Sequence, residues 1–496
     1  MKRLFYTIIL LTVMAAYASA EADLSGGYKA PPVNLHKYSV GHTRSAELPS
    51  KYDSRDYGLI TTSRNQVISG PCWAFATCDA IEASFNKLGH TTTWLAPQVF
   101  TNCHDGYLWP KTHGGNSQIA ASMLSHLKGP VEEEGAPYAA SETDCPDYSD
   151  DYVPGYSPVT YFLPENDLEA IKECIYEYGA VSAAMRYSSA YYNHDTNTYC
   201  YTGTEEPNHG ISLIGWDDEE QVFIAKFNYG ATAFVNGCMK ISYNDSRIME
   251  ACSAFPTFIP KSSMEKVYGF DNTGMTGYIP FSSAQETVSA FCYYETGSED
   301  EILEYVGSYA TTPGETLTFT VLAAEKLYTK EITCNYRGFH IAKFDEPITI
   351  RGTFIVAVDY SSKSIPCERE AEGYNEPVLI PTGKQYIQID NKEYWTYPVG
   401  SDAPKYNNIN LCIKAYTRKQ TPTNANEGTA EETPVVIDGK INPDVWNEAE
   451  SIDIYTLDGR LLQHLTQNSL VNSKGLLIFV VRNSNGAVKS SLELLK

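Results

Sequence analysis

The chain has little positive charge. Its 496 residues hold 37 Lys and Arg against 61 Asp and Glu, a formal net charge of −24. So acidic a surface repels phosphate backbones and anionic lipid headgroups, and no local basic patch offsets it. We therefore expect no nucleic-acid partner and no binding to anionic membrane surfaces.

Several other signatures are missing. Beyond the N-terminal segment, no apolar run reaches the roughly 18 residues that a membrane-spanning helix needs. No His/Cys spacing is typical of a zinc site, and there is no glycine-rich phosphate loop and no internal repeat. The sequence thus predicts a chain without transmembrane segment, metal or cofactor.

The first twenty residues indicate export. Lys2 and Arg3 precede an apolar run over 4–16, and the segment ends in Ala18-Ser19-Ala20. A basic start, a short apolar middle and an A-x-A end are typical of a cleaved secretory signal. An exported protein can keep disulfides, so the twelve cysteines are interpreted as a partial disulfide framework with some free thiols.

Composition changes along the chain and predicts several segments. Residues 47–261 mix helical and strand patterns, whereas 262–417 show alternating segments such as 316–322 and 353–359, separated by turn residues. The second region is predicted to be an antiparallel β-sandwich. The full division is signal 1–20, short pro-segment 21–46, mixed domain 47–261, sandwich 262–417, polar linker 418–436 and small all-β module 437–496.

One cysteine occupies a position suited to a nucleophile. Cys72 follows Pro71, and the apolar residues after it recur at helical spacing, which predicts a helix that starts here. Free N–H groups and the helix dipole favour an anion in the first turn, so the pKa of Cys72 is expected to be lowered. Cys78 lies on the predicted buried stripe and is interpreted as an inert core thiol.

A thiolate nucleophile needs a proton carrier, and histidine is the usual one. Among ten histidines, His209 stands at the start of a buried-looking strand that runs to Trp216. An isolated histidine in such a place is more often a hydrogen-bonded core residue than a catalytic one. A catalytic role for His209 is therefore inferred only together with the other motifs of the sequence.

Several motifs together resemble the papain-like cysteine peptidases. They are Gln66 six residues before the cysteine, the Cys72-Trp-Ala-Phe75 run, and the distant His209 followed by an apolar strand. The resemblance extends from Leu48 to Gly237. It implies an α+β, two-lobed peptidase over 47–261.

The resemblance also implies roles for single residues. Cys72 would be the nucleophile, His209 the general acid/base, and Gln66 an oxyanion donor beside the Cys72 N–H. Peptide bonds of protein or peptide substrates would be hydrolysed through an acyl-thioester. The implied substrate-binding residues are Gly114 and Gly115 for the main chain, and Ala184 and Gly210 for a roomy pocket that takes the second residue before the scissile bond.

The third catalytic position departs from the family. Phe227 stands where an Asn normally orients the histidine, and Asn228 follows one residue later. A one-residue slip or bulge at the strand end would be needed to aim Asn228 at His209. The competing hypothesis is therefore a weakened or inactive homologue that acts as a surface protein- or glycan-binding module.

The family's disulfides are matched in part. The resemblance implies bridges between Cys103 and Cys145 and between Cys200 and Cys252. A third family bridge is absent, since Ser69 and Thr112 occupy its places. Cys174 is interpreted as a buried thiol. The cysteines left unassigned are Cys238, Cys292, Cys334, Cys367 and Cys412.

The pro-segment is short. About 26 residues separate Ala20 from Glu47, too few for the long helical propeptide of many family zymogens. Latency would have to come from a strand-like segment that lies over the cleft, or be absent.

The later regions resemble two accessory domains. Val267–Asp271 and Tyr336–His340 resemble the lectin-like domain that follows the peptidase in some bacterial papain-like proteins, which implies a glycan partner; a structural spacer is the alternative. Ile452–Tyr455 and the run after Gly475 resemble the C-terminal sorting domains of type IX secretion. That implies the type IX machinery as a partner and a secreted or cell-surface location; an ordinary β-module is the alternative.

Overall fold

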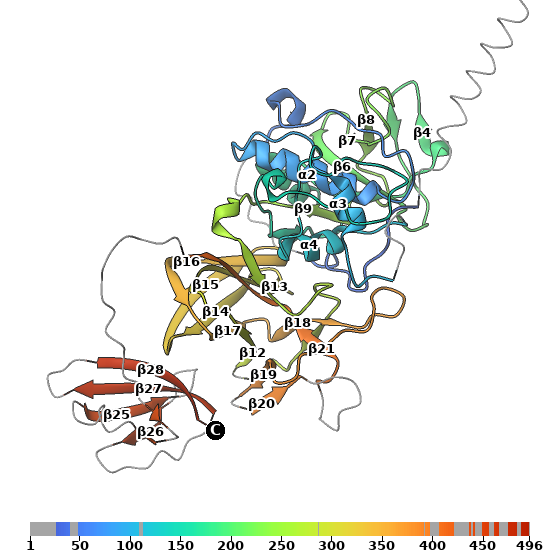
Figure 1. Cartoon of the computed structure of the whole chain (residues 1–496). Coiled ribbons are helices and arrows are strands. Elements are labelled where there is room, and N and C mark those ends of the chain that lie inside the picture. The colour runs from blue at the N-terminus through green and yellow to red at the C-terminus, as the bar shows by residue number, and fades with distance from the viewer. Residues whose placement is uncertain are drawn as a thin grey trace, which may run out of the picture.

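The computed structural model describes residues 26–39, 48–108, 113–285, 287–390, 392–396 and 406–420, together with the strands after 435. The predicted signal over 1–20 and most of the predicted linker over 418–436 lie outside the described residues. Figure 1 shows the order of the parts along the chain: a mixed α/β region, a β-sandwich beneath it, and a small C-terminal sheet. None of the helices in the described ranges is long and apolar enough to cross a membrane.

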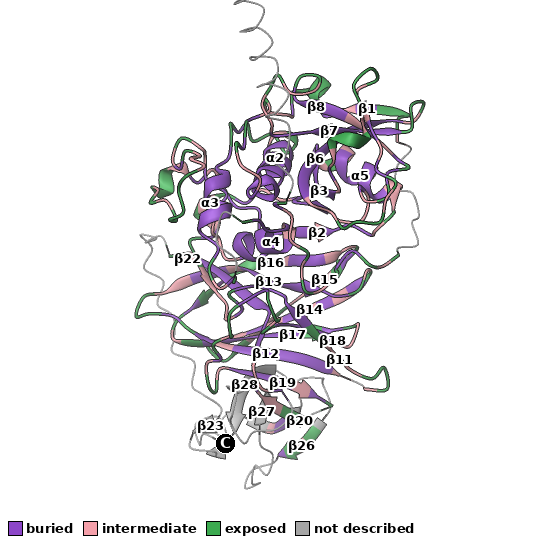
Figure 2. Ribbon diagram, turned by 90° about the vertical axis from the view of Figure 1, so that its right-hand side faces the viewer, coloured by how far each residue is buried: buried purple, intermediate pink, exposed green. Residues whose placement is uncertain are grey.

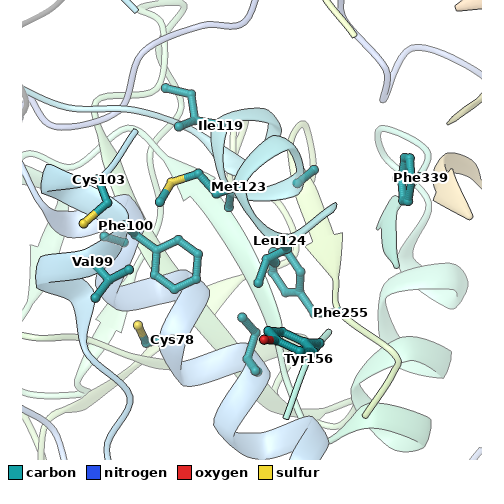
Figure 3. Packing of buried hydrophobic residues seen from close by; sticks show 14 of the residues in the cluster. Cys78, Val99, Phe100, Cys103, Ile119, Met123, Leu124, Tyr156, Phe255 and Phe339 are labelled. Atoms are coloured by element: carbon teal, nitrogen blue, oxygen red, sulfur yellow. The ribbon is translucent and has the colours of Figure 1, made fainter. Parts of the chain in front are cut away.

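The first lobe is helical and centres on α2 (Cys72–Lys87), with α3 (Pro97–Asn102) and α4 (Ser117–Ser125) beside it. The predicted helix start is confirmed, because α2 begins at Cys72 directly after Pro71. Every residue of α2 from Cys72 to Phe85 is buried, so the predicted apolar stripe is only one face of a central helix. Figure 3 shows part of the apolar cluster that α2, α3 and α4 share.

The second lobe is an antiparallel sheet. Its strands β3 (Val181–Met185), β6 (His209–Asp217), β7 (Val222–Lys226) and β8 (Cys238–Ser242) are neighbours in that order. All nine residues of β6 are buried, as the predicted strand after His209 requires. The other elements of this region are β1 (Lys51–Asp53), β2 (Thr160–Phe162), β4 (Tyr192–Asn193), β5 (Thr198–Tyr199), β9 (Cys252–Ala254), α5 (Leu168–Tyr178) and the 3-10 turns Ser54–Tyr57, Asp150–Tyr152, Ser189–Tyr191 and Lys261–Ser263.

The two lobes meet where β6 crosses the start of α2. A Cβ added at Gly210 would lie 2.9 Å from the Cα of Trp73, so only glycine lets the strand come this close to the helix. Ser212 Oγ donates to the Ala76 carbonyl at 3.2 Å. These contacts fix the start of β6 against the first turn of α2.

The sandwich forms as predicted over the segments 316–322 and 353–359, which lie in β14 and β17. Burial alternates along β14, whereas residues 354–358 of β17 are all buried. One sheet has the order β15-β14-β17-β12-β19-β20, and β13, β16, β22 and β10 form the facing one. The strands are β10 (Lys266–Tyr268), β11 (Gly277–Pro280), β12 (Val288–Glu295), β13 (Glu301–Ala310), β14 (Glu315–Ala323), β15 (Lys326–Cys334), β16 (Arg337–Ile350), β17 (Thr353–Tyr360), β18 (Ser364–Arg369), β19 (Gln385–Ile389), β20 (Lys392–Trp395), β21 (Ile409–Leu411) and β22 (Ile413–Lys419).

One sheet runs through both regions. β16 pairs antiparallel with β2, with Arg337 opposite Phe162 and Phe339 opposite Thr160. Gly338 has φ +141°, and a side chain there would clash with the Thr160 carbonyl. Figure 2 shows β2 beside α4 and β16 just below it, at the boundary between the two regions. The sequence predicted two domains but not this shared sheet.

Polar contacts also join the two regions. Tyr416 Oη donates to the Ser125 carbonyl at 2.8 Å, and Ser122 Oγ donates to the Asn272 carbonyl at 3.0 Å. Nearby, the fully buried Lys414 and Asp271 form an ion pair at 2.6 Å. The sandwich therefore covers the side of α4 that faces it and shields that side from solvent.

A separate four-stranded antiparallel sheet ends the chain, in the order β26-β25-β27-β28. Its strands are β25 (Ala449–Tyr455), β26 (Leu461–Leu465), β27 (Gly475–Asn483) and β28 (Val488–Leu495), preceded by the pair β23 (Val436–Ile437) and β24 (Lys440–Ile441). β25 and β27 contain Ile452–Tyr455 and the run after Gly475, in line with the predicted all-β character of 437–496.

Candidate active site

Cys72 is the first residue of α2 and is buried. Its Sγ accepts a hydrogen bond from the Gly210 N–H at 3.2 Å, so the thiol lies next to the residue that follows His209. The two predicted catalytic residues therefore stand at the starts of α2 and β6, where the lobes meet.

The predicted lowering of the Cys72 pKa is wrong for this state of the protein. Burial raises the pKa of the Cys72 thiol to about 11. The N–H groups of Gly210, Trp73, Cys72 and Gly27 act in the opposite direction, as expected at a helix start. Desolvation outweighs them, and the thiol stays protonated at neutral pH.

His209 is fully buried, and burial lowers its pKa to about 3. Its ring stacks on Phe227 with centroids 5.7 Å apart and lies 5.0 Å from the ring of Tyr229. The Tyr229 hydroxyl is 3.5 Å from Nδ1. Nε2 has no hydrogen-bond partner in the described part of the chain.

Asn228 does not reach His209. Its Nδ2 donates to Asp79 Oδ2 at 2.8 Å, and its Oδ1 accepts from the Arg64 N–H at 3.4 Å. The slip needed for the predicted orienting role is not seen: Phe227 faces His209 and Asn228 faces Asp79. Asp79 Oδ2, which also accepts from Ser212 Oγ at 3.3 Å, holds the Asn228 amide on this side of the strand.

A cluster of buried charges underlies Asn228. Lys226 Nζ contacts Asp79 Oδ1 at 2.8 Å, and Arg64 contacts Glu82 at 3.2 Å. Glu82 also accepts from the Leu95 N–H at 2.7 Å. This cluster, missed by the sequence reasoning, ties α2 to the end of β7. The sequence does contain a sign of this cluster, because Asp79 and Glu82 lie within an otherwise apolar helix and buried acids need partners.

Gln66 is buried beside the loop that precedes Cys72. Its backbone is held by a hydrogen bond from its N–H to the Asn228 carbonyl and by one from Tyr138 Oη to its own carbonyl. Its Nε2 donates to the Ile68 carbonyl at 2.8 Å and to the Ser69 carbonyl at 3.4 Å. Both acceptors are carbonyls of the loop that leads to Cys72.

Part of the short pro-segment lies across the cleft. Gly115 donates its N–H to the Gly27 carbonyl at 2.9 Å, and the Lys29 N–H donates to the Gly115 carbonyl at 2.9 Å. The Gly26 N–H donates to the Asn208 carbonyl at 2.7 Å. A Cβ on Gly27 would lie 2.6 Å from Cys72 Sγ, so the main chain passes directly over the thiol. Residues 26–29 thus run over the cleft as the first of the two alternatives for latency requires, and latency itself stays a prediction.

The predicted substrate-binding residues contact this segment. Gly114 has φ +125° and any side chain on it would clash with the Gly27 carbonyl. Ala184 and Gly210 line a small cavity with Tyr28 of the pro-segment and Ala251. The structure thus brings all four residues together around a bound peptide chain.

One of the two predicted disulfides forms. Cys103 and Cys145 are bonded, with Cα atoms 4.7 Å apart, which confirms that bridge. The predicted Cys200–Cys252 bridge is wrong, because both are free thiols. Cys252 lies in β9 and Cys200 follows β5, and four strands separate β9 from β5 in the sheet. The predicted core thiols Cys78 and Cys174 are buried and free, and the unassigned Cys238, Cys292, Cys334, Cys367 and Cys412 are free as well.

Comparisons with known proteins agree with this geometry. Residues 48–256 match the model of the papain family cysteine proteases, and residues 267–417 match that of the lectin like domain. The chain is 26% identical over 228 residues to a KDEL-tailed cysteine endopeptidase of Arabidopsis thaliana, covering 46% of this chain and 63% of that protein. It is also 26% identical over 222 residues to pro-cathepsin H of Bos taurus, covering 42% and 64%. The chain thus spans less than two thirds of the length of either relative.

A solved structure shares the two-domain fold. The cysteine protease and lectin-like domains of Cwp84, a surface layer associated protein of Clostridium difficile, superpose with a TM-score of 0.67 at 20% identity, covering 83% of this chain and 96% of that one. The family matches and the site around Cys72 and His209 lead to one conclusion: residues 48–256 form a papain-like cysteine peptidase domain, followed by a lectin-like domain.

Proposed function

We propose that the chain is the latent precursor of an exported cysteine endopeptidase. The observation that carries this proposal is the peptide segment bound over Cys72, held through its main chain by Gly115 and Asn208. A cleft that binds one peptide main chain beside a buried Cys/His pair is equipped to bind another as substrate.

The proposed reaction uses the groups already described. With the cleft open, Cys72 transfers its proton to His209, and the thiolate attacks the scissile carbonyl. The Cys72 N–H and the Gln66 side chain bind the oxyanion. His209 then gives the proton to the leaving amine, and water hydrolyses the acyl-thioester in a second step.

In the closed state this reaction is blocked. The pKa of Cys72 is raised to about 11 and that of His209 lowered to about 3, both by burial, so neither group is charged between these values. The Gly27 carbonyl accepts from Gly115 and not from Gln66, so it is not presented to the oxyanion site. Removal of the segment would rehydrate both groups and favour the thiolate–imidazolium pair.

A test of the enzyme hypothesis uses the protein without residues 21–46. We expect it to hydrolyse members of a broad peptide panel and to be labelled at Cys72 by an irreversible thiol inhibitor. Cys72→Ala is the control and should lose both. Absence of turnover and of Cys72 labelling in the unmutated protein would exclude the peptidase.

The second candidate is a binding protein on a peptidase scaffold, with a protein or glycan as its ligand. Phe227 in the orienting position and Asn228 turned toward Asp79 support it, because His209 lacks an amide partner. It predicts peptide binding by the opened cleft without turnover. Measuring peptide binding and peptide turnover on one preparation distinguishes the two candidate functions.

We further propose delivery to the cell exterior through the type IX machinery. The predicted signal over 1–20 and the separate all-β module over 437–496 support this, and the similar Cwp84 is described as surface layer associated. Deleting residues 437–496 should retain the protein inside the cell envelope. Unchanged delivery would count against the sorting role. A glycan bound by the lectin-like domain would supply a further surface contact.

A further inference from the structure

The His209 ring has an unusual set of neighbours. Phe227 covers it on one side, at a centroid distance of 5.7 Å and an interplanar angle of 24°, and offers no hydrogen-bond acceptor. Asn228, the nearest amide in sequence, is bound to Asp79. A proton-transfer histidine still needs its ring fixed, because rotation would move its nitrogens away from the thiol.

The Tyr229 hydroxyl is a polar group in contact with the His209 ring. It lies 3.5 Å from His209 Nδ1, and the two ring centroids are 5.0 Å apart. We propose that Tyr229 is the positioning residue that holds the His209 imidazole, in place of the amide that this chain lacks. The inference rests on the proposed peptidase function.

The main chain around Tyr229 is fixed by two adjacent residues of one loop. Tyr229 pairs with Asn65 in an isolated antiparallel bridge, and the Gly230 N–H donates to the Arg64 carbonyl at 2.8 Å. The ring also lies 5.7 Å from that of Phe227. The hydroxyl is therefore presented by a rigid segment that is anchored to the loop before Cys72.

A phenol suits this role chemically. With Nε2 as the nitrogen that takes the thiol proton, Nδ1 carries its hydrogen in both the neutral and the protonated ring. The phenol oxygen can therefore accept from Nδ1–H throughout the proton cycle. Burial raises the pKa of Tyr229 well above its usual value, and the nearby Cys72 adds to this. The phenol thus stays neutral while the thiol ionises, and no second anion forms beside the sulfur.

The test compares Tyr229→Phe with Tyr199→Phe in the protein without residues 21–46. Tyr199 belongs to the same aromatic cluster, stacks on Tyr187, and donates to the Arg186 carbonyl rather than to His209. We expect Tyr229→Phe to lower kcat about 10- to 100-fold with KM within about threefold, and to raise the pH at which iodoacetamide alkylates Cys72. Tyr199→Phe should leave the alkylation profile unchanged.

Several results would overturn the inference. If the unmutated protein hydrolyses peptides and Tyr229→Phe matches it in kcat and in alkylation profile, Tyr229 does not position His209. An equal loss in both variants, with equal falls in melting temperature, would show a structural role only. If the unmutated protein has no turnover, the proposed function fails; the alkylation profiles then decide alone, and a shift confined to Tyr229→Phe supports the inference.

Discussion

Gly27 controls whether the cleft can close. Any side chain there would clash with the Ser69 carbonyl and come within 2.6 Å of Cys72 Sγ. We expect Gly27→Val to prevent the segment from seating, so that the full chain hydrolyses peptides without prior removal of residues 21–46. The measurement is initial hydrolysis rate of the uncleaved chain. Ala30→Val, on the exposed end of the same segment, should remain latent; equal latency of both would contradict this account.

His36 makes binding of the pro-segment sensitive to acid. It is buried against Phe162, its Nδ1 is 2.9 Å from the Leu163 carbonyl, and burial followed by the charge of Arg337 lowers its pKa to about 4. In the released segment its pKa returns to the usual 6.5. Between pH 4 and pH 6.5 His36 takes up a proton in the released segment but not in the bound one. Binding of the segment is therefore weakened as the pH falls below 6.5.

A peptide of residues 26–39 tests this pH dependence. We expect its affinity for the Cys72→Ala protein that starts at residue 48 to fall on the order of tenfold between pH 7 and pH 5, measured by calorimetry. His36 is the only histidine in the peptide. The peptide with His36→Gln should lose most of the pH dependence of affinity that arises from the peptide itself. Identical pH dependence of the two peptides would exclude His36 as its source.

Ala184 bears on substrate choice. It lines a small cavity together with Tyr28 of the segment bound in the cleft. We expect good substrates to carry Tyr, Phe or another large apolar residue two positions before the scissile bond. Ala184→Leu should lower kcat/KM for these about 10- to 100-fold while sparing substrates with Ala there. Equal effects on both substrate classes would mean that Ala184 does not border the specificity pocket.

At the scale of elements, local pattern predicted strands and helices well where one periodicity dominates. The start of α2 at Cys72, the buried β6 after His209 and the alternating β14 all follow from local pattern. β17 forms where a strand is predicted, but its residues 354–358 are all buried. What failed depended on distant partners. Asn228 turns to Asp79, and four strands lie between β9, which holds Cys252, and β5. Neither fact is encoded near the residue concerned.

The junction of β2 and β16 can be tested through Gly338. Its φ of +141° and the Thr160 carbonyl beside it exclude a side chain. We expect Gly338→Ala to lower the free energy of unfolding by about 2–4 kcal/mol, measured by denaturant titration. Gly297 has no neighbouring atom within 4 Å of an added Cβ, so Gly297→Ala should change stability little. Similar losses in both would argue against a tight junction.

At the scale of the whole molecule, the peptidase and lectin-like regions share one core. Buried residues of α4 belong to the same apolar cluster as Tyr309, Phe339 and Tyr416 of the sandwich, and Tyr416 donates to the Ser125 carbonyl. The composition shift near residue 262 predicted the change of fold class but not this packing, since the contacts link residues some 290 positions apart.

Cutting at that boundary should therefore damage the peptidase. A protein of residues 48–261 exposes the apolar side of α4 and the edge of β2, both covered in the full chain. We expect a lower melting temperature and aggregation, measured by light scattering. Removing residues 421–496 instead should leave the melting temperature of the peptidase nearly unchanged. A stable, monomeric 48–261 protein would refute the shared core.

The shared sheet limits which domains can be recombined with this peptidase. A replacement partner would have to supply a strand that pairs with β2 and carries a glycine opposite the Thr160 carbonyl. Few unrelated β-domains meet that requirement, so gene fusions that shuffle modules at this boundary are expected to fail. The peptidase and the lectin-like region should accordingly be inherited and exchanged as a single unit, whereas the module after residue 435 is free to be replaced.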